Sequence, residues 1–294
     1  MACYKNLLGH KCVSVIFGDP EACFWQQTHA RGMFCMSDLS ISTYEPGGRW
    51  RFNWVLPVLF QPRRAFARMV EMDTAVWHTP ILILILTGLV RTLVDGGLKA
   101  AAAASGQISL PPGWEYYTPE QQAQFQQAMT ATSGPVFTYL LPAVIAVLGV
   151  YLGWLLLGWL LHLGLTLLGG RLSSQQVLNV TAWSLLPFAL RDVVRTVAMW
   201  NNGQTLSSLG LSGFAPAGEG PMMLYIAALL TFIDIYLLWH WLLLGIGLNA
   251  GANLSKLKTW TAVLLTVLIL FLLRGVPALI SAQFSDLTVI RPFF

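Results

Sequence analysis

The stretch TFIDIYLLWHWLLLGIG, residues 231–247, is apolar over nearly its whole length but carries an aspartate, Asp234, and a histidine, His240. It belongs to a longer run, 222–249, that is long enough to cross a membrane, because a spanning helix needs about 20 mainly apolar residues. Charged and polar groups inside such a helix are costly unless they are paired or serve a function. Asp234 and His240 must therefore act either as contacts between helices or in a transport or catalytic path.

The composition of the whole chain indicates a membrane protein. Of 294 residues, 55% are hydrophobic and 10% are charged, and the mean hydropathy is +0.62, which excludes a water-soluble domain. Apolar runs of spanning length lie at 79–97, 135–168, 178–200, 222–249 and 259–281. We therefore predict an all-α polytopic helix bundle with about five transmembrane helices.

The second apolar run is longer than a single span requires. Thirty-five residues, 135–169, would form a helix of roughly 52 Å, well beyond the ~30 Å hydrocarbon core of a bilayer. No turn signal divides the run. We predict one long helix that extends past the membrane.

Lys and Arg residues are unevenly distributed among the connections between the predicted spans. With the N-terminus inside, the inner connections contain Arg49, Arg51, Arg63, Arg64, Arg68, Arg171, Lys256 and Lys258, and the outer ones contain Lys99 and Arg291. Basic residues concentrate in cytoplasmic connections. The N-terminus is therefore predicted to be cytoplasmic and the C-terminus to lie outside.

Residues 1–35 differ from the rest of the chain because they contain all four cysteines, Cys3, Cys12, Cys23 and Cys35. Gaps of 9 to 12 residues lack the close pairing typical of zinc sites, so a metal site is the weaker interpretation. The preferred one is that Met36 is the natural start and that residues 1–35 are not native or are disordered. The remaining division is a short cytoplasmic segment at 36–56, a membrane domain at 57–281 and a short outer tail at 282–294.

Residues 50–72 combine aromatic and aliphatic residues with Arg63, Arg64 and Arg68. Prolines at 57 and 62 divide the segment into one or two short amphipathic pieces. These are expected to lie on the cytoplasmic leaflet with their arginines toward anionic lipid headgroups. Three arginines beside a span are the usual orientation signal, so no nucleic-acid partner is expected.

The long connections at the outer side differ in character. In YYTPEQQAQFQQAMTA, Thr118 is placed to cap a short helix, with Pro119 at its first position and Gln121 at its third. The second connection, NNGQTLSSLGLSGFAPAGEGP, is rich in Gly and Ser and is expected to be flexible. It contains GLSG, residues 210–213, but Ser212 precedes the next span by about ten residues and no histidine follows His240, which disfavours an intramembrane hydrolase. No cofactor motif is present, and we expect a non-enzymatic protein.

Seven charged residues occupy the outer half or the centre of the predicted spans. They are Arg91, Asp95, Arg191, Asp192, Arg195, Asp234 and Arg274. Four arginines against three aspartates could nearly neutralise one another across the bundle. For Asp234, about twelve residues into its span, the preferred interpretation is a structural pair with Arg195 or Arg274; the alternative is a proton- or ion-coupled role.

Two further features of the spans are interpreted as packing. His240 follows Asp234 by six residues, a rotation of about 240° on a helix, so the two cannot face one another. His240 is therefore expected to hydrogen-bond between helices as a neutral imidazole. Gly149 and Gly153 form a GxxxG pattern, which predicts a close helix approach.

Three segments together resemble the Yip family, named for Ypt/Rab-interacting proteins, and specifically its short bacterial members. They are LFQPRRAFARMVE (59–71), LLGGRLSSQQVLNVTAWSLLPFAL (167–190) and IDIYLLWHWLLLGIGLNAGANLSKLKTW (233–260). The resemblance covers about residues 57–281 and implies a five-span domain. For eukaryotic relatives it also implies association with small GTPases and vesicle traffic. This chain lacks a long acidic N-terminal region and a DLYGP-type segment, so GTPase binding is doubtful here.

These observations lead to one preferred function and one alternative. The preferred function is a scaffold or accessory subunit in membrane organisation, trafficking or transport, which contacts the lipid bilayer and other membrane proteins or further copies of itself. The expected location is a bacterial inner membrane, with a eukaryotic endomembrane as the alternative. The second candidate is a small permease or ion-coupled transporter that uses Asp234. The absence of an evident inverted repeat or of paired broken helices argues against it.

Overall fold

The computed structural model of the protein describes residues 3–4, 11–12, 50–72, 74–105, 114–132, 134–206, 209–215 and 220–288. The chain divides into two compact units, residues 1–47 and 48–294. In the first, β1 (Cys3–Tyr4) pairs antiparallel with β2 (Lys11–Cys12). Cys23, Cys35 and Met36 lie outside the described residues, and so do the candidate metal site and the expected start that depend on them.

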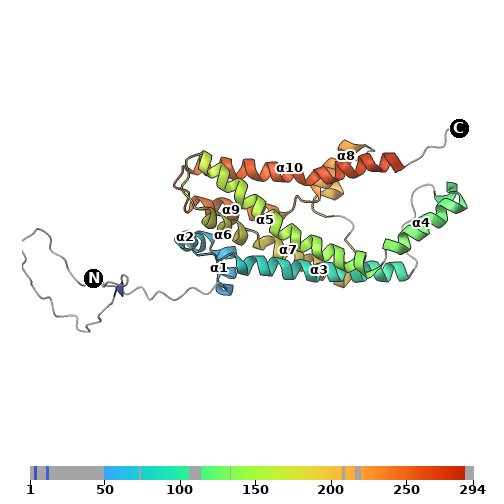
Figure 1. Cartoon of the computed structure of the whole chain (residues 1–294), viewed down its shortest axis with the longest axis horizontal. Coiled ribbons are helices and arrows are strands. Elements are labelled where there is room, and N and C mark those ends of the chain that lie inside the picture. The colour runs from blue at the N-terminus through green and yellow to red at the C-terminus, as the bar shows by residue number, and fades with distance from the viewer. Residues whose placement is uncertain are drawn as a thin grey trace, which may run out of the picture. The chain divides into compact units, whose positions relative to one another are not determined.

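The second unit is a bundle of apolar helices (Figure 1). Its spanning elements are α3 (His78–Ala104), α5 (Leu141–Leu167), α6 (Ser174–Ser184) with α7 (Leu186–Asn202), α8 (Pro221–Leu230) with α9 (Ile235–Asn249), and α10 (Lys256–Thr288). Among the described residues, four helices are long and apolar enough to cross a membrane, and the bent pair α8–α9 supplies a fifth span. The prediction of an all-α membrane bundle with about five spans is confirmed.

The second span is one continuous helix, as the sequence predicts. A π-helical turn, Val136–Leu140, leads directly into α5, so that the helix runs for 32 residues from Val136 to Leu167. At 1.5 Å per residue it is about 48 Å long, which exceeds the hydrocarbon thickness.

Pro187 interrupts the third span, and the interruption creates a contact with the fourth. Because proline has no N–H and resists the helix interior, α6 ends at Ser184 and α7 begins at Leu186. The N–H of Phe188 donates to the carbonyl of Leu185 at 2.9 Å instead of reaching Ser184 four residues back. The Ser184 carbonyl accepts a hydrogen bond from Nδ1 of the buried His240, at 2.8 Å. His240 thus bonds between helices, as predicted.

The fourth span is broken at Asp234. The prediction that Asp234 lies about twelve residues inside one continuous spanning helix is therefore wrong. The axes of α8 and α9 differ by 67°. Asp234 is the N-cap of α9, and its Oδ1 accepts the N–H of Leu237 at 2.9 Å. Aspartate is favoured at this position because it satisfies an amide that has no helical partner. Among the described residues, α8–α9 is the one pair of helices bent by more than 40°, whereas α6 and α7 together still form one span of 29 residues, Ser174–Asn202.

The connection between α7 and α8 supports this break. Residues 209–215, which were expected to be part of a flexible loop, include a 3₁₀ turn, Ser212–Phe214. The N–H of Leu211 donates to the carbonyl of Leu230 at 2.9 Å. Gly210 has φ +57°, and a Cβ there would lie 2.7 Å from three carbonyl oxygens at the end of α8, so only glycine fits without strain. The loop therefore packs against the point where the span bends.

A short helical cap packs against one end of the bundle (Figure 1). It consists of the 3₁₀ turn Phe52–Trp54, α1 (Val55–Phe60) and α2 (Pro62–Val70). Phe66 and Met69 of α2 are fully buried in the core. The apolar face of α2 is therefore occupied by the protein itself.

Two side chains of α6 fix the segment that joins the cap to α3. Asn179, which is fully buried, accepts the N–H of Val76 at 3.0 Å and donates to the carbonyl of Thr74 at 2.9 Å. Trp183 Nε1 donates to the carbonyl of Val76 at 3.0 Å. These hydrogen bonds tie the cap to the bundle across more than 100 residues of sequence.

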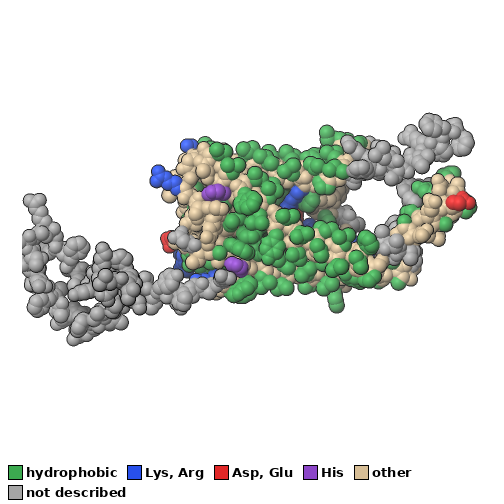
Figure 2. Space-filling view, viewed as in Figure 1, with side chains coloured by type: hydrophobic (Ala, Val, Ile, Leu, Met, Phe, Trp, Pro, Cys, Tyr) green, Lys and Arg blue, Asp and Glu red, His purple; other side chains and the backbone are tan. Residues whose placement is uncertain are grey.

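The opposite end carries α4 (Pro119–Thr132), which begins as the sequence predicts. Gln121 N–H donates to Thr118 Oγ1 at 3.3 Å, and Thr118 N–H donates to Gln121 Oε1 at 2.9 Å, which is a complete capping box. A 3₁₀ turn, Trp114–Tyr116, precedes it, and the Trp114 ring contacts Phe125 edge-on. Between the two ends, the surface seen in Figure 2 is mainly hydrophobic, as expected for helices in lipid.

Candidate functional site

Five charged side chains meet where α7 passes the break in span four. Arg191 and Arg195 are one helical turn apart, so both face the same neighbour. Arg191 Nη1 lies 3.5 Å and Arg195 Nη2 lies 3.3 Å from Oδ2 of Asp234. Asp192 contacts Arg191 at 4.0 Å and, on its other side, Arg91 of α3 at 3.3 Å. The chain of contacts therefore joins α3, α7 and the start of α9.

Both carboxylate oxygens of Asp234 have partners in this cluster. One carboxylate oxygen caps α9 and the other is shared by Arg191 and Arg195. The three side chains are only 12–18% exposed, which places the pairs in a medium of low dielectric and strengthens them. These contacts suit a structural clamp that holds α7 against the bend.

Two of the seven intramembrane charges lie outside the cluster. Asp95 pairs with Lys99 one turn along α3, at 2.7 Å, so it is not available to the arginines. Arg274 of α10 lies over the ring of Phe232, with its Cζ 5.3 Å from the ring centre. Within the described part of the chain, no carboxylate lies within 4.0 Å of its guanidinium. The cluster together with Arg274 thus contains four arginines and two aspartates.

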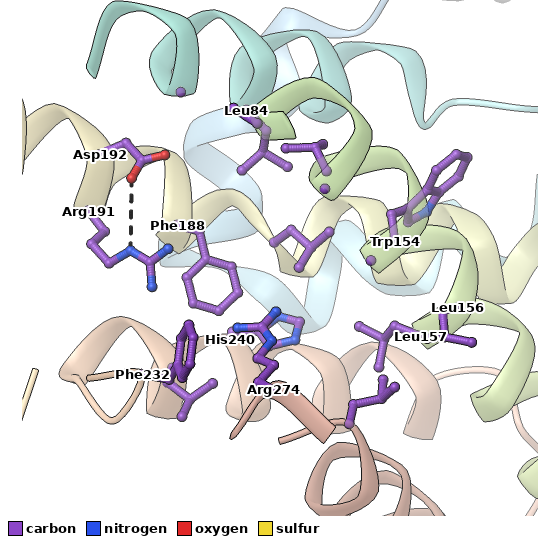
Figure 3. Close-up of a pocket in the computed structure, with 18 of the residues that line it drawn as sticks. Leu84, Trp154, Leu156, Leu157, Phe188, Arg191, Asp192, Phe232, His240 and Arg274 are labelled. Atoms are coloured by element: carbon purple, nitrogen blue, oxygen red, sulfur yellow. Dashed lines mark ion pairs between the residues drawn. The ribbon is translucent and has the colours of Figure 1, made fainter. Parts of the chain in front are cut away.

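A cavity of about 540 Å³ lies beside the cluster, between α3, α5, α7, α9 and α10. Its polar lining is formed by Arg91, Arg191, Asp192, His240 and Arg274, and the rest is mainly apolar. Figure 3 shows Arg191, Asp192 and Phe232 on one side of the cavity and Trp154, Leu156 and Leu157 on the other, with Phe188, His240 and Arg274 near the middle. The cavity therefore has a basic end and an apolar end.

Gly149 and Gly153 line this cavity, and no helix of the described chain packs closely on either glycine. Among the described residues, no atom lies within 4 Å of the position that a Cβ would take at either of them. A GxxxG pattern permits close approach but does not require a neighbour. Here the missing side chains leave space between α5 and the other helices.

The arginines predicted to contact lipid lie elsewhere, on the cap. Arg63, Arg64 and Arg68 are exposed on α2, opposite its buried face. Arg63 and Arg64 border a second hollow, of about 410 Å³, which Phe60 and Ile246 also line. Among the residues that the structure describes, no group of three or more His, Cys, Asp or Glu side chains is placed to hold a metal ion.

The sequence model of the Yip1 domain matches residues 56–275, three quarters of the chain. The chain belongs to the Yip1 domain family. The matched range begins in α1 and ends within α10, so α2, nearly all of α1 and all five spans fall within or overlap the domain. Comparison with curated proteins and with solved structures gives no match. The protein is thus an integral membrane protein of the Yip type.

Sequence reasoning identified the charged residues but not their arrangement. It placed Asp234 in a helix interior, although an aspartate followed by an apolar helical run is also an N-cap signal. It did not foresee the cavity, because a cavity is a property of five packed helices and leaves no local pattern. Pro187 could have indicated an interrupted helix with an available backbone carbonyl, which here is the Ser184 carbonyl that accepts from His240.

Proposed function

We propose that this Yip1 domain protein is a non-enzymatic scaffold or accessory subunit in membrane organisation, trafficking or transport. The observation that supports this most directly is the cap, because α1 and α2 form a fixed surface at one end of the bundle. In the orientation favoured by the Lys and Arg distribution, the cap faces the cytoplasm and the C-terminus lies outside. A bacterial inner membrane is the proposed location, with a eukaryotic endomembrane as the alternative.

The cap carries the two features of a surface that docks at a membrane interface. Large apolar side chains of α1 are exposed, with Leu56 at 65% and Phe60 at 72%, and they are available to enter the leaflet. The exposed Arg63, Arg64 and Arg68 follow directly and suit anionic headgroups. Because Phe66 anchors α2 in the core, this surface is held rigidly with respect to the spans.

A rigid basic surface at the membrane also suits recognition of a neighbouring membrane protein or of a second copy of the chain. Preorganisation lowers the entropy cost of association. Binding of a small GTPase is not part of this proposal.

Purification in a mild detergent, followed by mass spectrometry of what co-purifies in stoichiometric yield, tests the proposal. The variant replaces Arg63, Arg64 and Arg68 with glutamine. The matched control replaces three other exposed basic residues, Arg171 in the connection between α5 and α6 and Lys256 and Lys258 in the first turn of α10, so the charge change is equal. We expect a defined companion that the control retains and the cap variant loses. A protein that purifies alone, or a companion indifferent to the cap, would contradict the scaffold role.

The alternative of a small permease or ion-coupled transporter using Asp234 gains support from one observation. Broken spans with an ionisable residue at the break are typical of transporter sites, and the chain has such a break at Asp234. In liposomes, a pH-gradient-dependent flux that Asp234→Asn abolishes without unfolding the protein would favour this alternative. Wild-type liposomes without such flux would exclude it for the solutes tested.

A further inference from the structure

We propose that the cavity between α3, α5, α7, α9 and α10 binds a phosphate-bearing anionic amphiphile, with its phosphate on Arg91, Arg191 and Arg274 and its hydrocarbon part along α5 and α10. This inference does not depend on the scaffold role, because it concerns the interior of the bundle and not the cap.

The first argument is charge. Arg91, Arg191, Arg195 and Arg274 carry four positive charges, and Asp192 and Asp234 carry two negative ones. An excess of two positive charges inside a spanning region is costly unless an anion enters. A phosphate group brings one negative charge as a diester and up to two as a monoester, and so offsets half or all of the excess.

The second argument is unused hydrogen-bonding capacity. Nε of Arg191 is buried and has no hydrogen-bond partner in the described structure. Nε of Arg91 is in the same condition, since it lies 3.3 Å from Asp192 but is not aligned with the carboxylate for a hydrogen bond. Arg274 has an aromatic contact in place of a carboxylate. Guanidinium groups bind phosphate through paired N–H donors, so these groups have donors to offer.

The third argument is shape. A volume of about 540 Å³ lies within the range of sites for small molecules. In Figure 3, Arg191 lies toward one end and Arg274 near the middle, whereas Trp154 and Leu157 lie toward the other end. A purely ionic ligand would leave the apolar end unfilled. A ligand with a phosphate head and a hydrocarbon tail fits both ends.

The fourth argument is access. Several lining residues of α5 and α10 are exposed apolar side chains, including Ile145, Leu156 and Leu273. Figure 2 shows basic side chains among the hydrophobic ones in the middle of the bundle, where this surface is hollowed. The cavity thus opens toward the region that lipid chains occupy, and Gly149 and Gly153 keep that side free of side chains. A ligand would enter from the bilayer, which favours a lipid over a free anion.

The experiment uses the full chain, purified and delipidated in detergent, with phosphatidylglycerol that carries a photoreactive diazirine on its acyl chain. After irradiation, labelled peptides are mapped by mass spectrometry, which separates cavity labelling on α5 and α10 from any labelling of the cap. We expect the cavity peptides to be labelled. Unlabelled phosphatidylglycerol should compete at least tenfold better than phosphatidylcholine, and inorganic phosphate should not compete.

Two variants approach the cavity from opposite ends. Arg274→Gln removes a phosphate-binding charge that takes part in no ion pair in the described structure, and Gly153→Leu fills the apolar end without changing charge. Each should reduce cavity labelling at least fivefold. Gly97→Leu on α3 is the matched control, because Gly97 is equally free of neighbours but does not line the cavity.

Labelling that survives both variants, or that phosphatidylcholine competes equally well, would overturn the proposal. Competition by inorganic phosphate at the concentration effective for phosphatidylglycerol would overturn it as well, because the site would then belong to a free anion.

Discussion

Removal of the charge at Asp234 should uncouple α7 from the bend in span four. In Asp234→Asn, the amide oxygen can still accept the N–H of Leu237, so the helix cap survives while the ion pairs with Arg191 and Arg195 are lost. In Asp234→Ala both the cap and the pairs are lost. Comparison of the two variants therefore separates the two roles of one side chain.

The distances set the expected size of the effect. At 3.3–3.5 Å, each pair is worth roughly 5 kcal/mol before desolvation, with an effective dielectric constant of about 20. Desolvation and the remaining 12–18% exposure reduce this. Breaking a buried pair typically costs 3–5 kcal/mol, so Asp234→Asn should destabilise the protein by about 3 kcal/mol. Loss of the cap in Asp234→Ala should add about 1 kcal/mol.

Unfolding by sodium dodecyl sulfate in mixed micelles measures these free energies, and double-mutant cycles assign them. Asp234→Asn combined with Arg195→Gln should show a coupling energy of about 1–3 kcal/mol. Asp234→Asn combined with Arg274→Gln should be additive within about 0.5 kcal/mol, since Arg274 contacts Phe232 instead. Additivity with Arg195, or wild-type stability of Asp234→Asn, would refute the clamp, and equal stability of the Asn and Ala variants would refute the cap role.

Three further outcomes follow from the fold. Asn179→Leu leaves the N–H of Val76 unpaired in the core, and with two hydrogen bonds lost it should reduce the free energy of unfolding by about 2–5 kcal/mol in the same micelle assay. Gly210→Ala should lower the melting temperature in detergent by several degrees because of its positive φ and three close carbonyls, whereas Gly213→Ala, with open space around it, should leave it unchanged within about one degree. Ser174→Cys in a cysteine-free background should react with an impermeant maleimide only after the cytoplasmic side is opened; labelling in intact cells would reverse the proposed orientation.

Features that depend on neighbours in sequence could be predicted. The spans follow from apolar runs, and the long second helix follows from the lack of a turn signal between 135 and 169. The start of α4 was predicted to the residue, because the capping box joins Thr118 to Gln121 over three positions.

Features that depend on contacts between spans could not be predicted. A run such as TFID contains no Gly or Pro, so no strong breaker marks the end of the helix before Asp234. The break becomes stable only when Arg191 and Arg195 reach the carboxylate and Gly210 packs against the last carbonyls of α8. For a related reason, the GxxxG pattern of α5 could not show whether another helix packs against it, because the sequence does not say whether a partner helix is present.

The bend between α8 and α9 also bears on how the protein is made. The groups that hold it belong to α7 and to the loop before α8, so the nascent run 222–249 reaches the insertion machinery as one apolar stretch with a bare aspartate. An aspartate at the centre of an inserting helix costs about 2.5–3.5 kcal/mol. Arg191 and Arg195 of α7 are also costly inside the membrane until they pair with Asp234. We therefore expect the third and fourth spans to leave the insertion machinery together, as a neutralised hairpin, and the bend to form as that hairpin enters lipid.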